Sequence, residues 1–136
     1  MEAMNLYLFV RNGTRGDFQA AIGLAATAAA LGREAHLYLT YEALFAWCRT
    51  NIDDLPVQHT DPSVQELVEN AVERGTVSEL SQLWDSAREA GTVRIYACST
   101  SAQVLRLEPE ELTKVDAVMG HATFMKMADS GHLMMI

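Results

Sequence analysis

The stretch Val93-Arg94-Ile95-Tyr96-Ala97-Cys98-Ser99-Thr100-Ser101 decides how the rest of the chain can be arranged. Residues 93–97 combine β-branched, aromatic and apolar side chains after the turn signal Gly91-Thr92, which predicts a strand. The three hydroxyl residues that follow can each cap a helix, and residues 102–107 are compatible with a helical segment. Cys98 is therefore expected where a strand gives way to the start of a helix.

This position has a chemical consequence for Cys98. Free backbone amides and the positive end of the helix dipole stabilise an anion, so a thiol at a helix N-terminus is acidified. We expect a nucleophile or sulfur carrier, with Ser99, Thr100 and Ser101 lining the site and stabilising its anion. The alternative is an inert cysteine that packs as a small hydrophobe, since free cysteines are among the most buried residues.

The chain before this stretch predicts a βαβ unit. Residues 6–10 form a continuous apolar run, which is typical of a strand buried on both faces. A glycine-containing loop at 11–16 leads to a helix expected over 18–31 with Asp17 as its cap, and a second strand is expected over 35–40. Units of this kind are right-handed in nearly all proteins.

The remaining pattern continues the alternation. Helices are expected over 41–50, 62–75, 77–90 and 122–128, a loop over 51–60 and a terminal strand over 132–136. Glutamates on the outer faces of the two middle helices indicate a solvated surface rather than an acidic site. The sequence shows no internal repeat and no linker, so we expect a single α/β domain over residues 1–136. It is predicted to be doubly wound, with a mainly parallel sheet and helices on both faces.

Composition excludes several classes of function. The chain of 136 residues has 49% hydrophobic and 21% charged residues, as globular proteins do. Its 18 acidic and 10 basic residues give a formal charge of −8, which argues against nucleic acid as a partner because phosphate binding needs clustered Lys and Arg. The weakly polar run at 20–32 is shorter than the roughly 20 apolar residues of a membrane span, so no membrane partner is expected. Residues 1–5 lack a basic secretory signal, and we expect a cytoplasmic protein.

The second cysteine and the four histidines do not suggest a metal site. Cys48 and Cys98 form neither a CxxC pair nor a zinc-like cluster with the histidines, so we expect no metal and no cofactor. Cys48 follows Trp47 in an apolar helical pattern and is expected to pack in the core or an interface. It can resolve a disulfide with Cys98 only if the fold brings their Cα atoms within about 7 Å.

The loop after the first strand supplies further candidates. Its backbone amides and arginines can hold an anion at the start of the next helix, although it is neither a P-loop nor a GxGxxG motif. In a doubly wound sheet this loop faces the same edge as Cys98, so Asn12, Gly13 and Arg15 are candidate anion-stabilising residues. A mobile surface turn is the alternative.

Two more residues are expected near the cleft at the carboxyl ends of the strands, where Cys98 is also expected. Thr40 ends the second strand and is expected to line the cleft. His121 follows Gly120 at the start of the last helix and is a candidate proton shuttle, with an exposed or capping role as the alternative. The nearby methionines are expected to pack in the core or in an oligomer, rather than to bind copper: Met125, Met127, Met134 and Met135.

Two segments give the sequence a resemblance to a known family. Residues 95–101, Ile-Tyr-Ala-Cys-Ser-Thr-Ser, are similar to the strand-then-Ala-Cys-x-x-Ser pattern of the DsrE/DsrF-like family. Residues 119–124, Met-Gly-His-Ala-Thr-Phe, are similar to its Val-Gly-Ala-x-x-Phe segment. The chain departs from the family at residues 105–107, where many relatives place a glycine, and at His121, which is often alanine.

The resemblance implies a fold and a function. The fold is a small doubly wound α/β sheet, commonly assembled into trimers or hexamers. The function is sulfur relay, in which the matching residue, Cys98, takes up sulfane sulfur as a persulfide from a donor protein and passes it to an acceptor. The alternative is a non-catalytic oligomeric module that binds a small anionic ligand or a partner protein in the same cleft.

Overall fold

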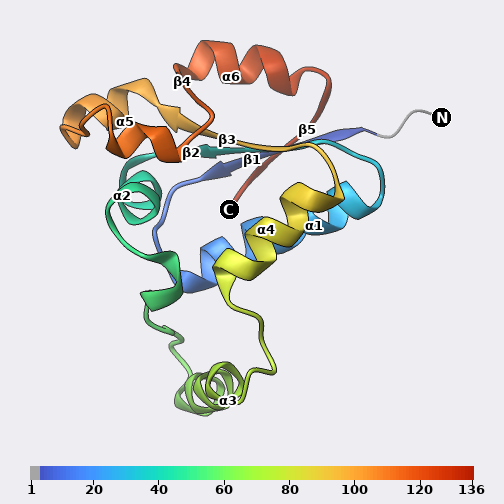
Figure 1. The fold of residues 1–136 in the computed structure, drawn as a ribbon, viewed down its shortest axis with the longest axis vertical. Helices are drawn as coiled ribbons and strands as arrows, with labels where there is room; N and C mark the ends of the chain where they lie inside the picture. The colour runs from blue at the N-terminus through green and yellow to red at the C-terminus, as the bar shows by residue number, and fades with distance from the viewer. Residues whose placement is uncertain (1–3) are drawn as a thin grey trace.

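The computed structural model describes residues 4–136. The segment 1–5, which was expected to lack a secretory signal, therefore lies partly outside the described residues. It contains a five-stranded sheet in the order β4-β3-β2-β1-β5, with helices on both faces (Figure 1). All neighbouring strands are parallel. The strands are β1 (Asn5–Val10), β2 (Ala35–Leu39), β3 (Val93–Cys98), β4 (Ala117–Met119) and β5 (Gly131–Met135). The predicted doubly wound α/β architecture is confirmed.

Six α-helices and two short 3-10 helices connect the strands within residues 4–136. The α-helices are α1 (Arg15–Ala30), α2 (Tyr41–Arg49), α3 (Pro62–Glu73), α4 (Leu80–Ala90), α5 (Ser99–Val104) and α6 (His121–Ala128). The 3-10 helices are η1 (Ile52–Asp54) and η2 (Glu111–Lys114). None of these helices combines the length and the apolar character that crossing a membrane requires.

The start of α1 differs from the prediction. The helix begins at Arg15, three residues before the expected start at 18. The reason is that Thr14, and not Asp17, caps it: the Thr14 hydroxyl oxygen accepts the backbone N–H of Asp17 at 3.1 Å. The end of the helix follows the prediction, because Gly32 adopts φ +75, the left-handed conformation that stops helices.

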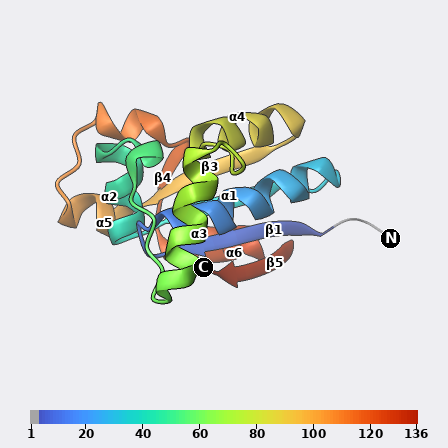
Figure 2. The same ribbon diagram turned by 90° about the horizontal axis from the view of Figure 1, so that it is seen from below.

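One face of the sheet carries an aliphatic core beneath α1 and α4 (Figures 1 and 2). Fully buried Leu8, Leu37 and Ile95 come from the three central strands. The buried face of α1 is rich in alanine, which lets the helix pack close to the sheet. Cys48 belongs to this core at 3% exposure, as its helical pattern predicts.

The opposite face, beneath α6, is aromatic (Figure 1). Tyr38 and Phe124 stack with their ring centroids 4.5 Å apart. The buried ring of His36 is stacked against Tyr7 at 4.8 Å and bonded to the hydroxyl of Tyr96 at 2.6 Å. Cys98 lies within this second cluster, so the two cysteines lie on opposite faces of the sheet.

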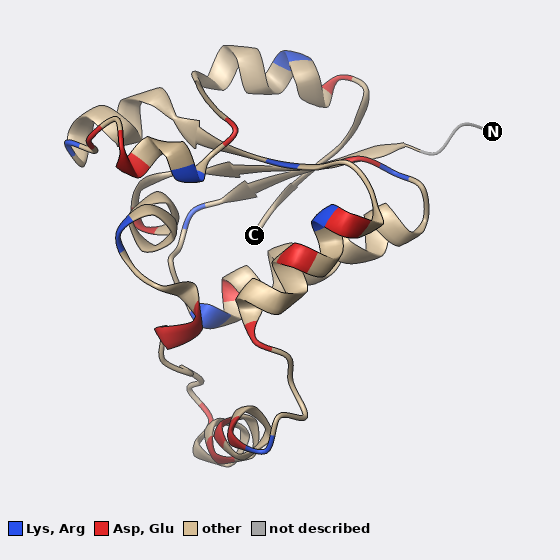
Figure 3. Cartoon of the chain, viewed as in Figure 1, with Lys and Arg blue, Asp and Glu red and all other residues tan. Residues whose placement is uncertain are grey.

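Helix α3 stands apart from the sheet (Figures 1 and 2). None of its residues is buried, and Leu67 is 66% exposed. The apolar stripe of this helix therefore does not face the core, because the segments on either side hold the helix away from the sheet. Figure 3 marks acidic residues on α3 and α4, the two helices for which solvated faces are expected.

Candidate functional site

Cys98 lies at the carboxyl end of β3, where the chain turns directly into α5. The predicted change from strand to helix is present, and Cys98 itself occupies the N-cap position, so the helix begins at Ser99 rather than near Ser101. Parallel sheets bind ligands outside the carboxyl ends of their strands, so this is an edge at which a site is expected.

Three side chains from separate elements meet beside this position. The Sγ atom of Cys98 lies 4.0 Å from Nδ1 of His121, the first residue of α6. The same nitrogen is 2.7 Å from the hydroxyl of Tyr38, which comes from β2. A thiol, an imidazole and a phenol are thus within reach of one another, a combination that can hold or move a proton.

The surroundings of Cys98 favour its thiolate. Burial alone raises the pKa of the thiol, since Cys98 is only 1% exposed. The side chains of Ser101 and Tyr38 and the backbone amides of Ser101 and Thr100 can donate to the thiolate, and this stabilisation outweighs burial, so the pKa of Cys98 lies below its ordinary value. The pKa of Tyr38 is raised, first by its burial and then by its hydrogen bond with Cys98, so the phenol keeps its proton.

The three hydroxyl residues after Cys98 lie in different environments. Ser101 is fully buried, and its hydroxyl has no hydrogen-bond partner in the resting arrangement of residues 4–136, which leaves it available to the thiolate. Thr100 is exposed and contributes its backbone amide. Ser99 is half-buried and lies beside Gly120, where an added Cβ would be 3.7 Å from the Ser99 hydroxyl oxygen.

A small apolar cavity of about 160 Å³ opens next to these side chains. Tyr38 and His121 form part of its wall, and the rest is apolar: Phe9, Phe124, Met125, Leu133 and Met135. Cys98 does not line the cavity itself, while His121 is exposed at the surface.

The structure shows where the candidate residues of the loop at 11–16 lie. Arg15 is 5% exposed, and its guanidinium donates to the backbone oxygen of Asp53 at 3.1 Å, so it ties α1 to η1. Gly13 packs against α2, where an added Cβ would be 2.5 Å from the backbone oxygen of Glu42. Asn12 is exposed in the loop. Helix α1 lies on the aliphatic face, whereas the thiol faces α6.

The sequence suggests Thr40 as the residue at the end of β2 that lines the site, but in the structure Tyr38 is the residue next to His121 and Cys98. Thr40 is buried, and its hydroxyl donates to the backbone oxygen of Val10 at 3.4 Å, so it bridges two strand ends. Tyr38, two residues earlier, is the residue of β2 that reaches the site, and sequence reasoning missed it. The period of two along a strand puts Tyr38 on the same face as Thr40, but only the β2–β3 register, with Tyr38 opposite Tyr96, places it near Cys98.

The described residues offer little for metal or disulfide chemistry. No group of three or more His, Cys, Asp or Glu side chains within residues 4–136 is arranged to hold a metal ion. Cys48 and Cys98 are both free thiols.

Comparison with known proteins agrees with this fold. The crystal structure of the ychN protein from E. coli superposes with a TM-score of 0.55 and 13% sequence identity, over 98% of this chain and 100% of that one. No curated protein sequence gives a match. The sequence profile of the DsrE/DsrF/DrsH-like family matches residues 50–136, more than half of the chain and the part that holds Cys98, Ser101 and His121. The chain belongs to the DsrE/DsrF/DrsH-like family.

Proposed function

We propose that the protein is a sulfur carrier that holds sulfane sulfur as a persulfide on Cys98. The observation that carries the proposal is the position of the Cys98 thiol at the start of α5, 4.0 Å from Nδ1 of His121, which in turn lies 2.7 Å from the hydroxyl of Tyr38. In these surroundings the pKa of Cys98 is lowered, although the residue is almost completely buried. A purely structural cysteine in an apolar core has its pKa raised, as Cys48 does through burial. Membership of the family supports a sulfur-relay type of fold.

The transfer requires no external oxidant or reductant. The Cys98 thiolate attacks the outer sulfur of a donor persulfide, a Cys98–sulfur bond forms, the donor S–S bond breaks and the donor leaves as a thiolate. An acceptor thiolate then attacks the outer sulfur on Cys98 in the same way, and Cys98 returns as a thiolate. One sulfur atom moves in each step, and the total oxidation state of the sulfur atoms is unchanged.

Tyr38, Ser101 and His121 have distinct roles in this proposal. Tyr38 and Ser101 donate hydrogen bonds to the sulfur anion. His121 lies 4.0 Å from the thiol and takes its proton before attack. An apolar cavity lies beside Tyr38 and His121.

We propose further that the protein works as a homo-oligomer, a trimer or hexamer as is common in the family. The support is the apolar surface of β5, an edge strand on which Leu133 and Met135 are 47% and 61% exposed. Both residues also line the cavity beside Tyr38 and His121, so a second copy seated there covers the entrance to the site. The proposed compartment is the reducing cytoplasm, which keeps both thiols free.

The test is incubation of the reduced protein with polysulfide, followed by intact mass spectrometry. We expect wild type and Cys48→Ser to gain one sulfur atom and Cys98→Ser to gain none. The Cys48→Ser variant is the matched control, since it removes the buried thiol on the other face. An equal adduct on Cys98→Ser, or none on wild type, contradicts the proposal.

The low exposure of Cys98 favours a second candidate, a non-catalytic module that binds a small anion or a partner protein in the same cleft. This candidate predicts alkylation of Cys98 with an ordinary pH midpoint near about 8.5. It also predicts thermal stabilisation by a ligand that persists in Cys98→Ala. A midpoint clearly below that value, lost in Cys98→Ala, supports the sulfur carrier instead.

A further inference from the structure

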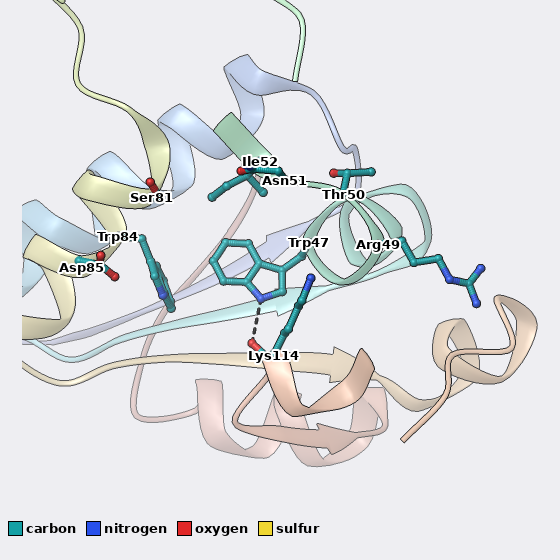
Figure 4. Close-up of a pocket in the computed structure, with 9 residues that line it drawn as sticks. All are labelled: Trp47, Arg49, Thr50, Asn51, Ile52, Ser81, Trp84, Asp85 and Lys114. Atoms are coloured by element: carbon teal, nitrogen blue, oxygen red, sulfur yellow. Dashed lines mark hydrogen bonds between the residues drawn. The ribbon is translucent and has the colours of Figure 1, made fainter. Parts of the chain in front are cut away.

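A second, larger cavity lies on the aliphatic side of the sheet, away from Cys98. It is open to solvent, has a volume of about 570 Å³, and is lined by residues of α2, η1, α4 and η2 (Figure 4). Small-molecule sites in proteins commonly have volumes of about 300–1,000 Å³. Nothing in the proposed sulfur chemistry uses this space.

Two tryptophans form the apolar wall of the cavity, and they are the two tryptophans of the chain. The rings of Trp47 and Trp84 meet edge to face, with centroids 5.1 Å apart and an interplanar angle of 76°. The indole N–H of Trp47 donates to the backbone oxygen of Lys114 at 2.9 Å, and the guanidinium of Arg88 lies 5.3 Å from the Trp84 ring. Both rings are therefore held in place before any ligand arrives.

The part of the cavity lining that comes from α4 and η1 is held together by hydrogen bonds as well. The carboxylate of Asp53 accepts hydrogen bonds from the backbone N–H of Ser81 at 2.9 Å and from its hydroxyl. This contact joins the first turn of α4 to η1, which together carry Ser81, Trp84 and Ile52 of the lining. A preformed aromatic wall reduces the ordering cost of binding a flat ligand.

Three charged side chains line the cavity: Arg49, Asp85 and Lys114. The guanidinium of Arg49 is paired with Glu111 at 2.7 Å and points away from the tryptophans in Figure 4. Lys114 donates to the backbone oxygen of Cys48 at 3.0 Å and forms no ion pair within residues 4–136. An ammonium has three N–H donors, so two of them remain for a ligand.

We propose that this cavity binds a small aromatic monocarboxylate. The aromatic ring packs against Trp47 and Trp84, and the carboxylate accepts hydrogen bonds from Nζ of Lys114, beside Trp47 in Figure 4. Asp85 adds one negative charge to the lining and so disfavours ligands with two negative charges. The site is independent of Cys98, because the tryptophans belong to the core on the other face.

The probes are α-naphthylacetate and its neutral analogue α-naphthylacetamide, added to the full-length protein labelled with ¹⁵N. The chain has only two tryptophans, so its two indole N–H signals both report on this cavity. We expect the carboxylate to shift both signals saturably, with a dissociation constant on the order of 1 mM or below, and to bind about tenfold more tightly than the amide.

Lys114→Met is expected to weaken binding of the carboxylate about tenfold and to leave binding of the amide unchanged, since a charge-assisted hydrogen bond is lost. Lys126→Met is the matched control, because the chain has two lysines and Lys126 lies on α6. Thermal denaturation of both variants confirms that they remain folded. Asp85→Asn is expected to tighten binding of the carboxylate by about two- to threefold, since a repulsive charge is removed.

Two results overturn the proposal. One is the absence of saturable shifts of the indole signals with either probe. The other is equal binding of the carboxylate and the amide in wild type, together with equal binding of the carboxylate by wild type and folded Lys114→Met. Both results leave the persulfide experiment on Cys98 unaffected, so the two proposals fail separately.

Discussion

The two faces of the sheet differ in the side chains that they bury. The face under α1 and α4 buries mainly aliphatic residues and alanine, together with the rings of Phe18, Trp47 and Trp84. The face under α6 buries Tyr7, Tyr38, Tyr96, Phe124 and Cys98 together with His36. Hydroxyl and imidazole groups are therefore concentrated in the interior on one side of the sheet, whereas the other side buries the guanidinium of Arg15, which donates to the backbone oxygen of Asp53.

We expect the aliphatic face to contribute mainly to the free energy of unfolding and the aromatic face to set the reactivity of the thiol. Closely packed aliphatic side chains gain free energy from burial and need no hydrogen-bond partners. The aromatic side pairs its hydroxyls with specific polar partners, as with Tyr38 and His121 at 2.7 Å or Tyr7 and Ser130 at 2.7 Å. Changes on the first side should alter the free energy of unfolding, and changes on the second side should alter the reactivity of the thiol.

The largest expected effect is on the aliphatic side. Leu37→Ala removes a fully buried side chain at the centre of the sheet and should lower the free energy of unfolding by about 2–5 kcal/mol. Urea denaturation measures this, with Leu67→Ala on exposed α3 as the control, which should change it by no more than about 0.5 kcal/mol. The pH midpoint of Cys98 alkylation should stay at its wild-type value. A shifted midpoint would mean that the two faces are not independent.

Tyr38→Phe tests the aromatic side. Loss of the phenol removes a hydrogen-bond donor to the thiolate, so the pKa of Cys98 should rise and the alkylation rate below the midpoint should fall about tenfold. The pKa of Cys98 is measured from alkylation rates across pH in the Cys48→Ser background, where Cys98 is the remaining cysteine. Tyr96→Phe is the matched control, because the hydroxyl of Tyr96 is bonded to His36. Equal shifts in both variants would indicate a general loosening of this face.

The smallest expected effect concerns Asp116, at the edge of the sheet. Partial burial alone raises the pKa of Asp116, but hydrogen bonds from Arg88 and from the backbone N–H of Ile95 outweigh it, so the pKa is lowered. A lowered pKa stabilises the fold at pH values above the unfolded value of about 3.9, and this contribution is lost as the pH falls through the folded value.

Asp116→Asn should therefore cost about 1 kcal/mol at neutral pH and progressively less below about pH 4, where wild type loses the same contribution. Urea denaturation at about pH 7 and about pH 3 measures the difference. Asp129→Asn, at an exposed residue after α6, is the control. A difference between wild type and Asp116→Asn that is constant across pH would contradict the assignment.

Much of the fold follows from local sequence patterns. The apolar run at 6–10, the alanine-rich helix after it and the strand that ends at Cys98 all lie where periodicity and turn residues predict them. The start of α1 was missed because Thr14 and Asp17 are both competent caps, and local sequence does not choose between them. The outward position of α3 was missed because an apolar stripe shows which face of a helix is hydrophobic but not whether anything packs against it.

At the candidate site, local sequence patterns predicted even less of the arrangement than they did for the fold. The sequence by itself determined the position of Cys98 at the end of a strand and the start of a helix, because the residues that fix it are neighbours in the chain. Only the tertiary structure decided that the guanidinium of Arg15 bonds to η1 and that Tyr38 and His121 lie next to the thiol. The same holds for the cavity lined by Trp47, Trp84 and Lys114. These arrangements depend on strand register and on the face to which each crossover helix is directed, and both are set by contacts between residues far apart in the chain.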